Sequence, residues 1–256
     1  MKPRVSYLIC CVPRTGSWLL AESLHSTGIA GRPREYFAPE VQHNFLSLWG
    51  MPPGSGYADY VGRVIREATT QNGVLGIKVH WYQFNDLMQQ LRSLQRLRDL
   101  PEECLLNEAI PNLRYIHLSR RDKVRQVVSY ARACETKLWW EIDSSVSLRR
   151  RVLAKTPRFD VDRLDRLFQL IVEHERAWRW YFGRCGITPF TVFYEDLADD
   201  LEATIGRILK YLEIPVPENL GANGSRLKKQ ADDLSELWVQ QYRQIRRSRQ
   251  TMERLT

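Results

Sequence analysis

The stretch from Val5 to Leu24 constrains the fold of this chain more than any other. It opens with an apolar, β-favouring run over 5–12, which has the length expected for a strand buried on both faces. A turn containing Gly16 follows, and an amphipathic segment with leucines at helical spacing begins directly after it. Strands buried on both faces belong mainly to parallel sheets covered by helices. The stretch therefore predicts an α/β fold with a central, mostly parallel sheet flanked by helices.

The turn at 13–17 also has the composition of an anion site. The first backbone N–H groups of a helix lack intrahelical partners and lie at the positive end of the helix dipole. Arg14 adds a cation, Gly16 lets the backbone approach an oxygen closely, and Ser17 adds a hydroxyl group. We therefore predict a phosphate-binding strand, loop and helix, although the same pattern also occurs as a plain connection.

Two other phosphate-binding motifs are excluded by the same residues. A Walker A loop has two glycines and a lysine before its hydroxyl residue, whereas this turn has one glycine and no lysine there. A cysteine-based phosphatase loop has an arginine six residues after its thiolate, but that count from Cys10 or Cys11 does not reach an arginine. We interpret both thiols as packing groups of the strand.

Length, charge and cysteine usage limit the class of protein. A chain of 256 residues with 43 % hydrophobic and 11 % aromatic residues can bury the core of one domain, so we predict a single domain over 1–256. The formal charge of +8 favours an anionic partner, which includes nucleotides, nucleic acids, phospholipids and acidic polymers. Five scattered cysteines without a C-x-x-C pair indicate neither a disulfide framework nor a zinc site. With no signal-peptide pattern and no run of about 18 apolar residues, we expect a cytoplasmic protein without stable membrane insertion.

The segment GRPREYF over 31–37 places a carboxylate among arginines and aromatic residues. Glu35 is a candidate general base toward a hydroxyl group, and a surface ion pair with Arg32 or Arg34 is the equally weighted alternative. The region 39–56 is rich in Pro, Gly, Asn and Ser, and we predict that it forms a long loop on the acceptor side of the site.

A second buried strand is predicted over VLGIKVHW, between helices expected at 57–69 and 84–100. Its end carries Lys78, His80 and Trp81. Because successive strand residues point to opposite faces, Lys78 and His80 should share one face of the sheet. A histidine at a strand end is more often a structural residue, and its lysine neighbour is what makes His80 a candidate base.

A second anion site is predicted where the third strand, 113–118, meets a helix over 123–137 that 119–122 should cap. Arg120 stands at the strand end and Ser129 lies about two and a half turns into the helix. A solvated basic turn is the alternative.

The basic and aromatic segment 137–159 should either cover the site or form a dimer contact, which is compatible with a homodimer. The predicted order then continues with a helix over 162–184, a fourth strand over 187–196 and a helix over 197–212. The tail should form a basic loop that carries Arg226, Lys228 and Lys229, followed by a final charged helix.

Three of these segments resemble motifs of one enzyme family. VPRTGSWLL over 12–20 resembles the 5′-phosphosulfate loop of sulfotransferases that use 3′-phosphoadenosine 5′-phosphosulfate (PAPS). IHLSRRDKVRQVVSY resembles the 3′-phosphate motif of that family, and FTVFYEDL resembles its strand whose tyrosine lies by the adenine. The motifs occur in the family's order. GRPREYF, GIKVHW and KKQADDLSELW resemble most closely its bacterial carbohydrate branch, so the resemblance covers nearly the whole chain.

The resemblance implies a role for each matching residue. The 5′-phosphosulfate contacts would come from Arg14, Thr15, Gly16, Ser17 and Trp18, although many relatives have a hydroxyl residue where this chain has Trp18. The 3′-phosphate would be held by Arg120 and Ser129, with Arg121 as the alternative to Arg120. Further cofactor contacts would come from Tyr194 and Lys229, and acceptor contacts from Lys78, Trp81, Tyr36 and Phe37.

The implied reaction moves a sulfuryl group from PAPS to a hydroxyl of a carbohydrate or glycosylated acceptor and leaves PAP, with no metal and no nucleic acid involved. Arg14, helped by Lys78, would stabilise the charge of the leaving phosphate. Glu35 is the favoured base, kept ionised by its arginine neighbours, and His80 would titrate between pH 6 and 7 from its reference pKa of about 6.5. The alternatives are a non-catalytic binder of nucleic acid or acidic polymer, and a nucleotide-dependent kinase on a related fold.

Overall fold

The structure is a computed structural model that describes residues 2–139, 157–217 and 232–253. These residues group into two compact units, which are described separately. The first comprises Met1–Ser119 and His174–Ser225, and the second comprises Arg120–Glu173 and Arg226–Thr256. The single domain predicted over 1–256 stays a prediction. In the described ranges no helix is both long enough and apolar enough to cross a lipid bilayer.

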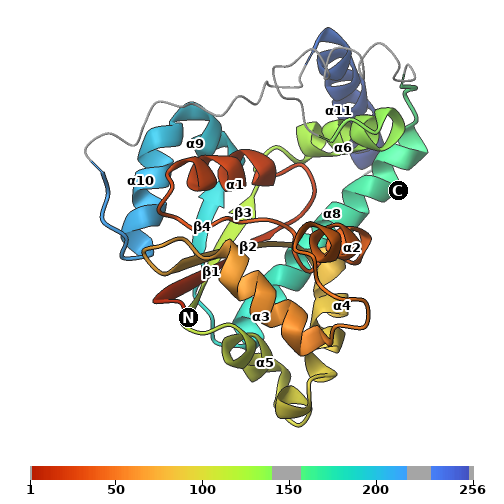
Figure 1. The fold of residues 1–256 in the computed structure, drawn as a ribbon. Coiled ribbons are helices and arrows are strands. Elements are labelled where there is room, and N and C mark those ends of the chain that lie inside the picture. The colour runs from red at the N-terminus through yellow and green to blue at the C-terminus, as the bar shows by residue number, and fades with distance from the viewer. Residues whose placement is uncertain (1, 140–156, 218–231, 254–256) are drawn as a thin grey trace. The chain divides into compact units, whose positions relative to one another are not determined.

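The first unit is built on a parallel sheet (Figure 1). Its described strands are β1 (Val5–Cys11), β2 (Val74–His80), β3 (Leu113–Ser119) and β4 (Phe190–Phe193), in the order β2-β1-β3-β4. Every pair of neighbours is parallel, which confirms the predicted α/β sheet. From β1 the chain leads to β2 on one side and then to β3 on the other. Open sheets of this kind bind ligands outside the carboxyl ends of the strands at such a reversal.

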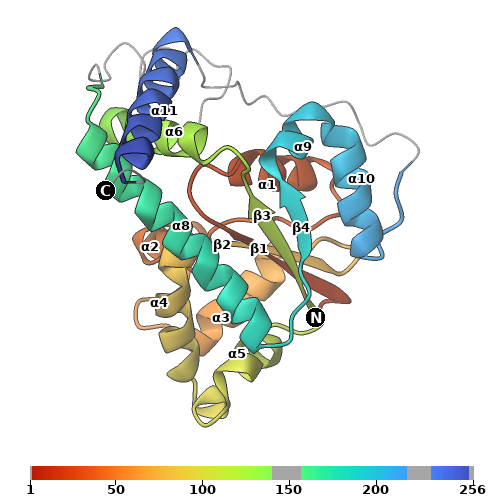
Figure 2. The ribbon, with the colours of Figure 1, turned by 180° about the vertical axis from the view of Figure 1, so that it is seen from behind.

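Alternation along the strands divides the core between two faces of the sheet. Tyr7, Ile9 and Cys11 of β1 pack in one buried cluster with leucines of α1 (Ser17–Ser26) and α10 (Leu201–Tyr211). On the other face, α4 (Trp81–Arg92) lies beside the C-terminal part of α8 (Val161–Arg184), as Figure 2 shows. Phe84 of α4 contacts Trp178 of α8 there. Both cysteines of β1 are fully buried, as expected for side chains packed within the strand.

The outer edge of β2 is covered by two short pairings. The Lys78 N–H donates to the Arg34 carbonyl oxygen at 3.0 Å, in a parallel bridge between Arg34 and Ile77. Thr69, just beyond α3 (Tyr57–Ala68), makes an antiparallel bridge with Leu75. The segment before Glu35 is thereby fixed alongside β2.

The predicted loop over 39–56 is wrong in its first half, where Pro39–Leu48 form helix α2. Pro39 stands in the first helical turn with Glu40, and both residues favour a helix start. Phe45 and Trp49 lie 4.8 and 5.8 Å from the Tyr36 ring, measured between ring centroids. The aromatic residues that looked like parts of a loop are therefore helix contacts.

Two further helix boundaries differ from the predictions. The helix expected over 84–100 begins at Trp81 and ends at Arg92, and η1 (Gln95–Leu97) and α5 (Glu102–Ala109) follow it. The strand expected over 187–196 ends at Phe193, and the chain from Tyr194 to Tyr211 forms two helices, α9 (Tyr194–Asp199) and α10, where one helix was expected over 197–212. Asp200 causes the division, because its side chain caps α10 by accepting from the Ala203 N–H at 2.9 Å.

The second unit consists of α6 (Lys123–Thr136), the N-terminal part of α8 and α11 (Asp233–Glu253). Asp122 accepts from the Arg125 N–H at 3.0 Å, which confirms the predicted cap of α6. Lys229 and most of the segment 137–159 lie outside the described residues, so their predicted roles stay predictions.

Candidate functional site

The predicted phosphate loop connects β1 to α1 with two residues in left-handed backbone conformations, Arg14 at φ 65° and Gly16 at φ 80°. A Cβ atom at Gly16 would lie 2.5 Å from Cδ2 of Tyr194. The position therefore requires glycine, and the loop backbone lies against the tyrosine ring that was predicted to stand by the adenine. The Thr15 hydroxyl donates to the Val12 carbonyl oxygen at 2.9 Å and is fully buried, so this side chain holds the shape of the loop.

The start of α1 has the properties of an anion cradle. Gly16 is its N-cap residue and provides no side-chain cap, and Ser17 is the first residue of the helix. The N-cap residue therefore offers no side-chain acceptor to the N–H groups of the first helical turn. Together with the positive end of the helix dipole, this arrangement suits an anionic oxygen.

A buried cluster of polar groups surrounds Glu35. Its Oε1 atom lies 2.8 Å from Lys78 Nζ and 3.5 Å from His80 Nε2, and its Oε2 atom accepts from Gln83 Nε2 at 2.8 Å. The Lys78 and His80 side chains are 3 % and 9 % exposed, and the Glu35 side chain is 27 % exposed. The structure thus confirms that Lys78 and His80 share one face of the sheet, and it brings both of them to the candidate base. The alternative of a surface ion pair with Arg32 or Arg34 is wrong, since Arg34 contacts Glu22 at 3.0 Å and Arg32 donates to the Glu67 carbonyl oxygen at 3.1 Å.

The cations determine the charge of Glu35. Burial alone would raise the pKa of its carboxyl group, but His80 and Lys78 lower the pKa far below its usual range. Glu35 is therefore a carboxylate at neutral pH. The predicted direction was right, but the cause is the pair of cations on β2 and not the neighbouring arginines.

The predicted titration of His80 between pH 6 and 7 is wrong. Burial lowers the pKa of the ring, but Cys11 and Glu35 outweigh it and raise the pKa to about 9. The Cys11 sulfur lies 3.4 Å from Nδ1, on the side of the ring opposite to Glu35. His80 is therefore an imidazolium at neutral pH.

Trp18 takes part in the same cluster through its ring. The guanidinium carbon of Arg34 lies 4.9 Å and Lys78 Nζ lies 5.2 Å from the ring centroid. Both distances are in the range of cation–π attraction. Trp18 thus helps to orient Lys78, and its predicted contact with the cofactor stays a prediction.

Three of the four predicted acceptor-binding residues lie in packed surroundings. Phe37 is 1 % exposed and meets the Tyr60 ring edge-on, and Tyr36 is 4 % exposed with its hydroxyl donating to the Arg32 carbonyl oxygen. Trp81 is half-buried and stacks on Phe84. Tyr36 and Phe37 are buried and Trp81 is half-buried, and the predicted contacts of these residues with the acceptor stay predictions. The fourth residue, Lys78, remains a candidate.

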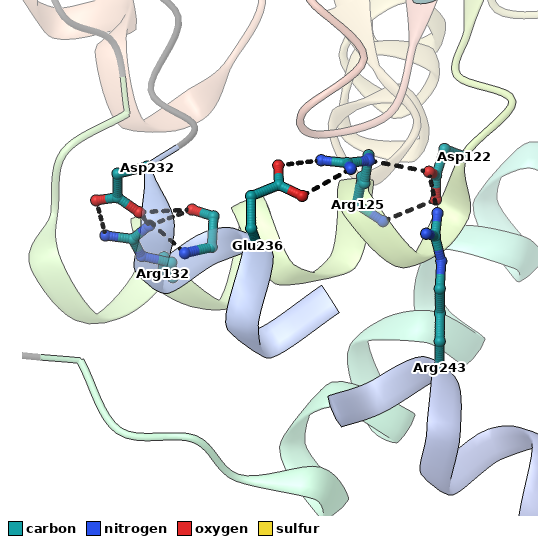
Figure 3. A network of polar contacts seen from close by, with 7 residues as sticks. Asp122, Arg125, Arg132, Asp232, Glu236 and Arg243 are labelled. Atoms are coloured by element: carbon teal, nitrogen blue, oxygen red, sulfur yellow. Dashed lines mark hydrogen bonds and ion pairs between the residues drawn. The ribbon is translucent and has the colours of Figure 1, made fainter. Parts of the chain in front are cut away.

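In the second unit, Ser129 lies on the stripe of α6 that also carries Arg125 and Arg132, because residues three and four apart share a helix face. Figure 3 shows that these arginines form ion pairs with carboxylates in the first turn of α11 and just before it. Arg125 contacts Glu236, with Nη2 to Oε2 at 2.7 Å, and Arg132 contacts Asp232, with Nη2 to Oδ2 at 2.8 Å. Arg120 is half-buried and Arg121 is exposed. The predicted choice of Arg120 for the 3′-phosphate stays a prediction.

Sequence reasoning missed two members of the Glu35 cluster. Gln83 was detectable, because it stands three residues after His80 with the spacing of a capping box, and its Oε1 atom accepts from the His80 N–H at 3.0 Å. Cys11 had no local signal, since its contact with His80 depends on the register between β1 and β2. The described residues contain no group of three or more His, Cys, Asp or Glu side chains placed to hold a metal ion.

Comparisons with known proteins identify the family of this chain. The family model described as Stf0 sulphotransferase matches residues 6–245. A trehalose 2-sulfotransferase of Mycolicibacterium smegmatis is 30 % identical, over 93 % of this chain and 94 % of that protein. One from Mycobacterium tuberculosis is 27 % identical with the same coverage. A solved sulfotransferase domain from the curacin biosynthetic pathway has a TM-score of 0.50 and 16 % identity, and the match covers 91 % of this chain and 82 % of that domain. At that identity, the likeness shows the fold.

Proposed function

This chain belongs to the Stf0 sulphotransferase family, and from that premise we propose that it transfers the sulfuryl group of PAPS to a hydroxyl group of a carbohydrate or glycosylated acceptor. The two curated relatives are both named trehalose 2-sulfotransferases, which supports a sugar acceptor. The observation that carries the proposal is the Glu35 cluster, in which an ionised, partly exposed carboxylate is held beside two buried cations.

The loop before α1 fits the 5′-phosphosulfate of this donor. A Cβ atom at Gly16 would clash with the Tyr194 ring, so only glycine lets the loop backbone take its compact course before the start of α1. In the proposed site, Arg14 and the N–H groups of the first turn of α1 neutralise the leaving phosphate, and Ser17 adds a hydroxyl donor. PAPS supplies the activated sulfuryl group when it is bound. Arg120 and Ser129 are proposed to hold its 3′-phosphate on the strength of the sequence motif.

Glu35 is the proposed base, and its two oxygens have different roles. Oε1 lies against the ammonium group of Lys78 and the imidazolium of His80, and among the described residues Oε2 accepts one hydrogen bond, from Gln83. A carboxylate oxygen can accept a further bond, so Oε2 is the atom that takes the proton of the acceptor hydroxyl. Oε1 keeps its contacts with Lys78 and His80 during this proton transfer.

A carboxylate of such low basicity suffices for this reaction. Transfer of a phosphoryl group passes through a loose transition state in which the protein mainly positions and neutralises charge, and sulfuryl transfer makes similar demands. The acceptor O–H becomes strongly acidic only as its oxygen bonds to sulfur. The proton therefore moves late, to a base that needs correct placement more than a high pKa. Lys78 then stabilises the negative charge that develops near it.

The test is a transfer assay with purified protein. PAPS and trehalose should give a product heavier by one sulfuryl group in mass spectrometry, and glucosides and glycolipids serve as further acceptors. ATP in place of PAPS tests the kinase alternative. Binding of nucleic acid or an acidic polymer, without turnover of PAPS toward any sugar in the panel, would contradict the proposal and support the binding-protein alternative.

A second assay tests the two proposed phosphate sites against each other. Arg14→Ala should lower both donor affinity and kcat, because Arg14 acts on the transferred group. Arg120→Ala should mainly raise KM for PAPS and weaken discrimination against adenosine 5′-phosphosulfate, which lacks the 3′-phosphate. If Arg121→Ala has that effect and Arg120→Ala does not, the assignment is wrong by one residue.

A further inference from the structure

Cys11 and His80 stand directly opposite each other at the carboxyl ends of β1 and β2. The Cys11 thiol is fully buried, and its sulfur lies 3.4 Å from His80 Nδ1 and 3.6 Å from the Val79 carbonyl oxygen. The backbone there is also fixed, because Trp178 Nε1 donates to the Cys11 carbonyl oxygen at 3.0 Å. The thiol therefore has a defined place beside one ring nitrogen of His80.

The other ring nitrogen faces the proposed base. His80 Nε2 lies 3.5 Å from Glu35 Oε1, so the ring lies between a thiol and a carboxylate. Glu35 can only accept hydrogen bonds, which requires a proton on Nε2. A thiol can donate to a neutral ring at Nδ1 or accept from an imidazolium, so the contact with Cys11 fits both protonation states.

We propose that Cys11 is a positioning residue that keeps Nδ1 of His80 occupied, so that Nε2 stays a hydrogen-bond donor to Glu35 and His80 does not act as the base. This inference rests on the proposed function in assigning the proton of the acceptor hydroxyl to Glu35. The arrangement of the ring itself does not depend on that function. The proposed role of Cys11 explains why this chain carries two candidate bases, Glu35 and the histidine at the end of β2, and uses only Glu35.

The remaining groups around His80 are consistent with this role. Tyr82 of α4 stacks on the imidazole at 5.6 Å between ring centroids, with an interplanar angle of 16°. Lys78 contacts the same Glu35 oxygen as His80, and Gln83 binds the His80 backbone. Cys11, Glu35, Lys78 and Tyr82 are thus titratable groups that contact the ring or its carboxylate partner. Cys11 is the one in contact with Nδ1.

The first test uses the unmodified protein without substrate. Nitrogen-15 NMR of the histidine rings, with His80 assigned through His80→Asn, should show the tautomer protonated at Nε2 once the ring is neutral above about pH 9. A neutral ring protonated at Nδ1 would overturn the proposal. This measurement needs no sulfuryl transfer, so it separates a failure of the inference from a failure of the proposed function.

The second test replaces the thiol. Cys11→Val removes the partner of Nδ1 but keeps an apolar side chain suited to a strand, and the His80 titration should move to lower pH by about one unit or more. Cys10→Val is the matched control, since Cys10 is equally buried and its sulfur lies near the Leu8 carbonyl oxygen instead. It should leave the His80 titration unchanged. An unchanged titration in Cys11→Val, or an equal shift in both variants, would overturn the proposal. If Cys11→Val does not fold, the tautomer of the neutral His80 ring in the unmodified protein decides whether the proposal holds.

Discussion

Glu35 in the first unit and Asp232 in the second are both carboxylates held by cations, but their surroundings differ. Two buried cations converge on Glu35, so that cluster has an excess of positive charge. In the network of Figure 3, the carboxylates of Asp122, Asp232 and Glu236 match the guanidinium groups of Arg125, Arg132 and Arg243. That network is balanced and half-exposed.

The difference shows how similar groups serve different purposes. A balanced network satisfies its own charges, and its effect is to hold α11 on α6. A cluster with one carboxylate and two buried cations has unmatched positive charge in a place of low dielectric, where an incoming anion is attracted strongly. The pKa of Asp232 is lowered mainly by its hydrogen bonds with Arg132, and that of Glu35 by His80 and Lys78 against the effect of burial. We therefore expect substitutions in the first cluster to change catalysis and those in the second to change stability.

The largest effect is expected from Glu35→Gln, which keeps the shape of the side chain and removes its charge. Turnover should fall about 10²-fold or more, because the amide cannot take a proton from the acceptor. PAPS should still bind, as measured by calorimetry. Glu103→Gln is the control, because Glu103 is a carboxylate paired with Arg184 at 2.8 Å outside the cluster, and its activity should be unchanged. Near-normal turnover of Glu35→Gln would contradict the catalytic role that separates the Glu35 cluster from the network of Figure 3.

A smaller effect is expected from His80→Asn, about 10-fold on kcat, since His80 supports Glu35 without taking the proton. The pH dependence sharpens the prediction. The His80 pKa of about 9 lies above its unfolded value of about 6.5, so its contribution to stability is complete below pH 6.5 and is lost as the pH rises through 9. Urea unfolding from pH 6 to 10 should show this loss in the unmodified protein and not in His80→Asn. The same pH dependence in both proteins would contradict the assignment.

The smallest effect is expected in the second unit. Arg132→Met removes the contacts with Asp232 and Ser235, and the free energy of unfolding should fall by about 1 kcal/mol, with less difference at high salt because the network is half-exposed. Arg184→Met breaks an exposed pair and should leave urea unfolding unchanged within error. The kcat value of Arg132→Met should stay near that of the unmodified protein. A large loss of kcat with unchanged stability would show that the network takes part in catalysis.

The parts of the fold that sequence predicted best are those with a continuous local pattern. The strand, turn and helix from Val5 to Leu24 contain their own hydrophobic periodicity and turn chemistry, and their boundaries agree closely with β1 and α1. Helix α2 was missed because its Pro, Asn and Ser residues favour a loop by composition, while its contacts with Tyr36 favour a helix. Packing decided between the two.

The sequence identified the main residues of the candidate site better than it identified the contacts between them. Glu35, Lys78 and His80 were identified from strand ends and motifs, but the ion pair between Glu35 and Lys78 joins residues that are far apart in sequence. It depends on the pairing of the Arg34 segment with β2, which no local pattern encodes. For the same reason, the reference pKa of histidine could not include the effect of the contact with Cys11, which raises the His80 pKa.

The pairing of Arg34 with Ile77 has one more consequence. β2 is a terminal strand of the sheet, and a long uncovered strand edge is a template for another chain. Arg34 and Thr69 cover this edge at Ile77 and Leu75. The segment that carries the proposed base is therefore also expected to protect the sheet edge against aggregation. A substitution that loosens this segment should lower both the yield of monodisperse protein and the rate of sulfuryl transfer. Loss of activity in such a variant should therefore be interpreted only after the protein has been shown to remain monodisperse.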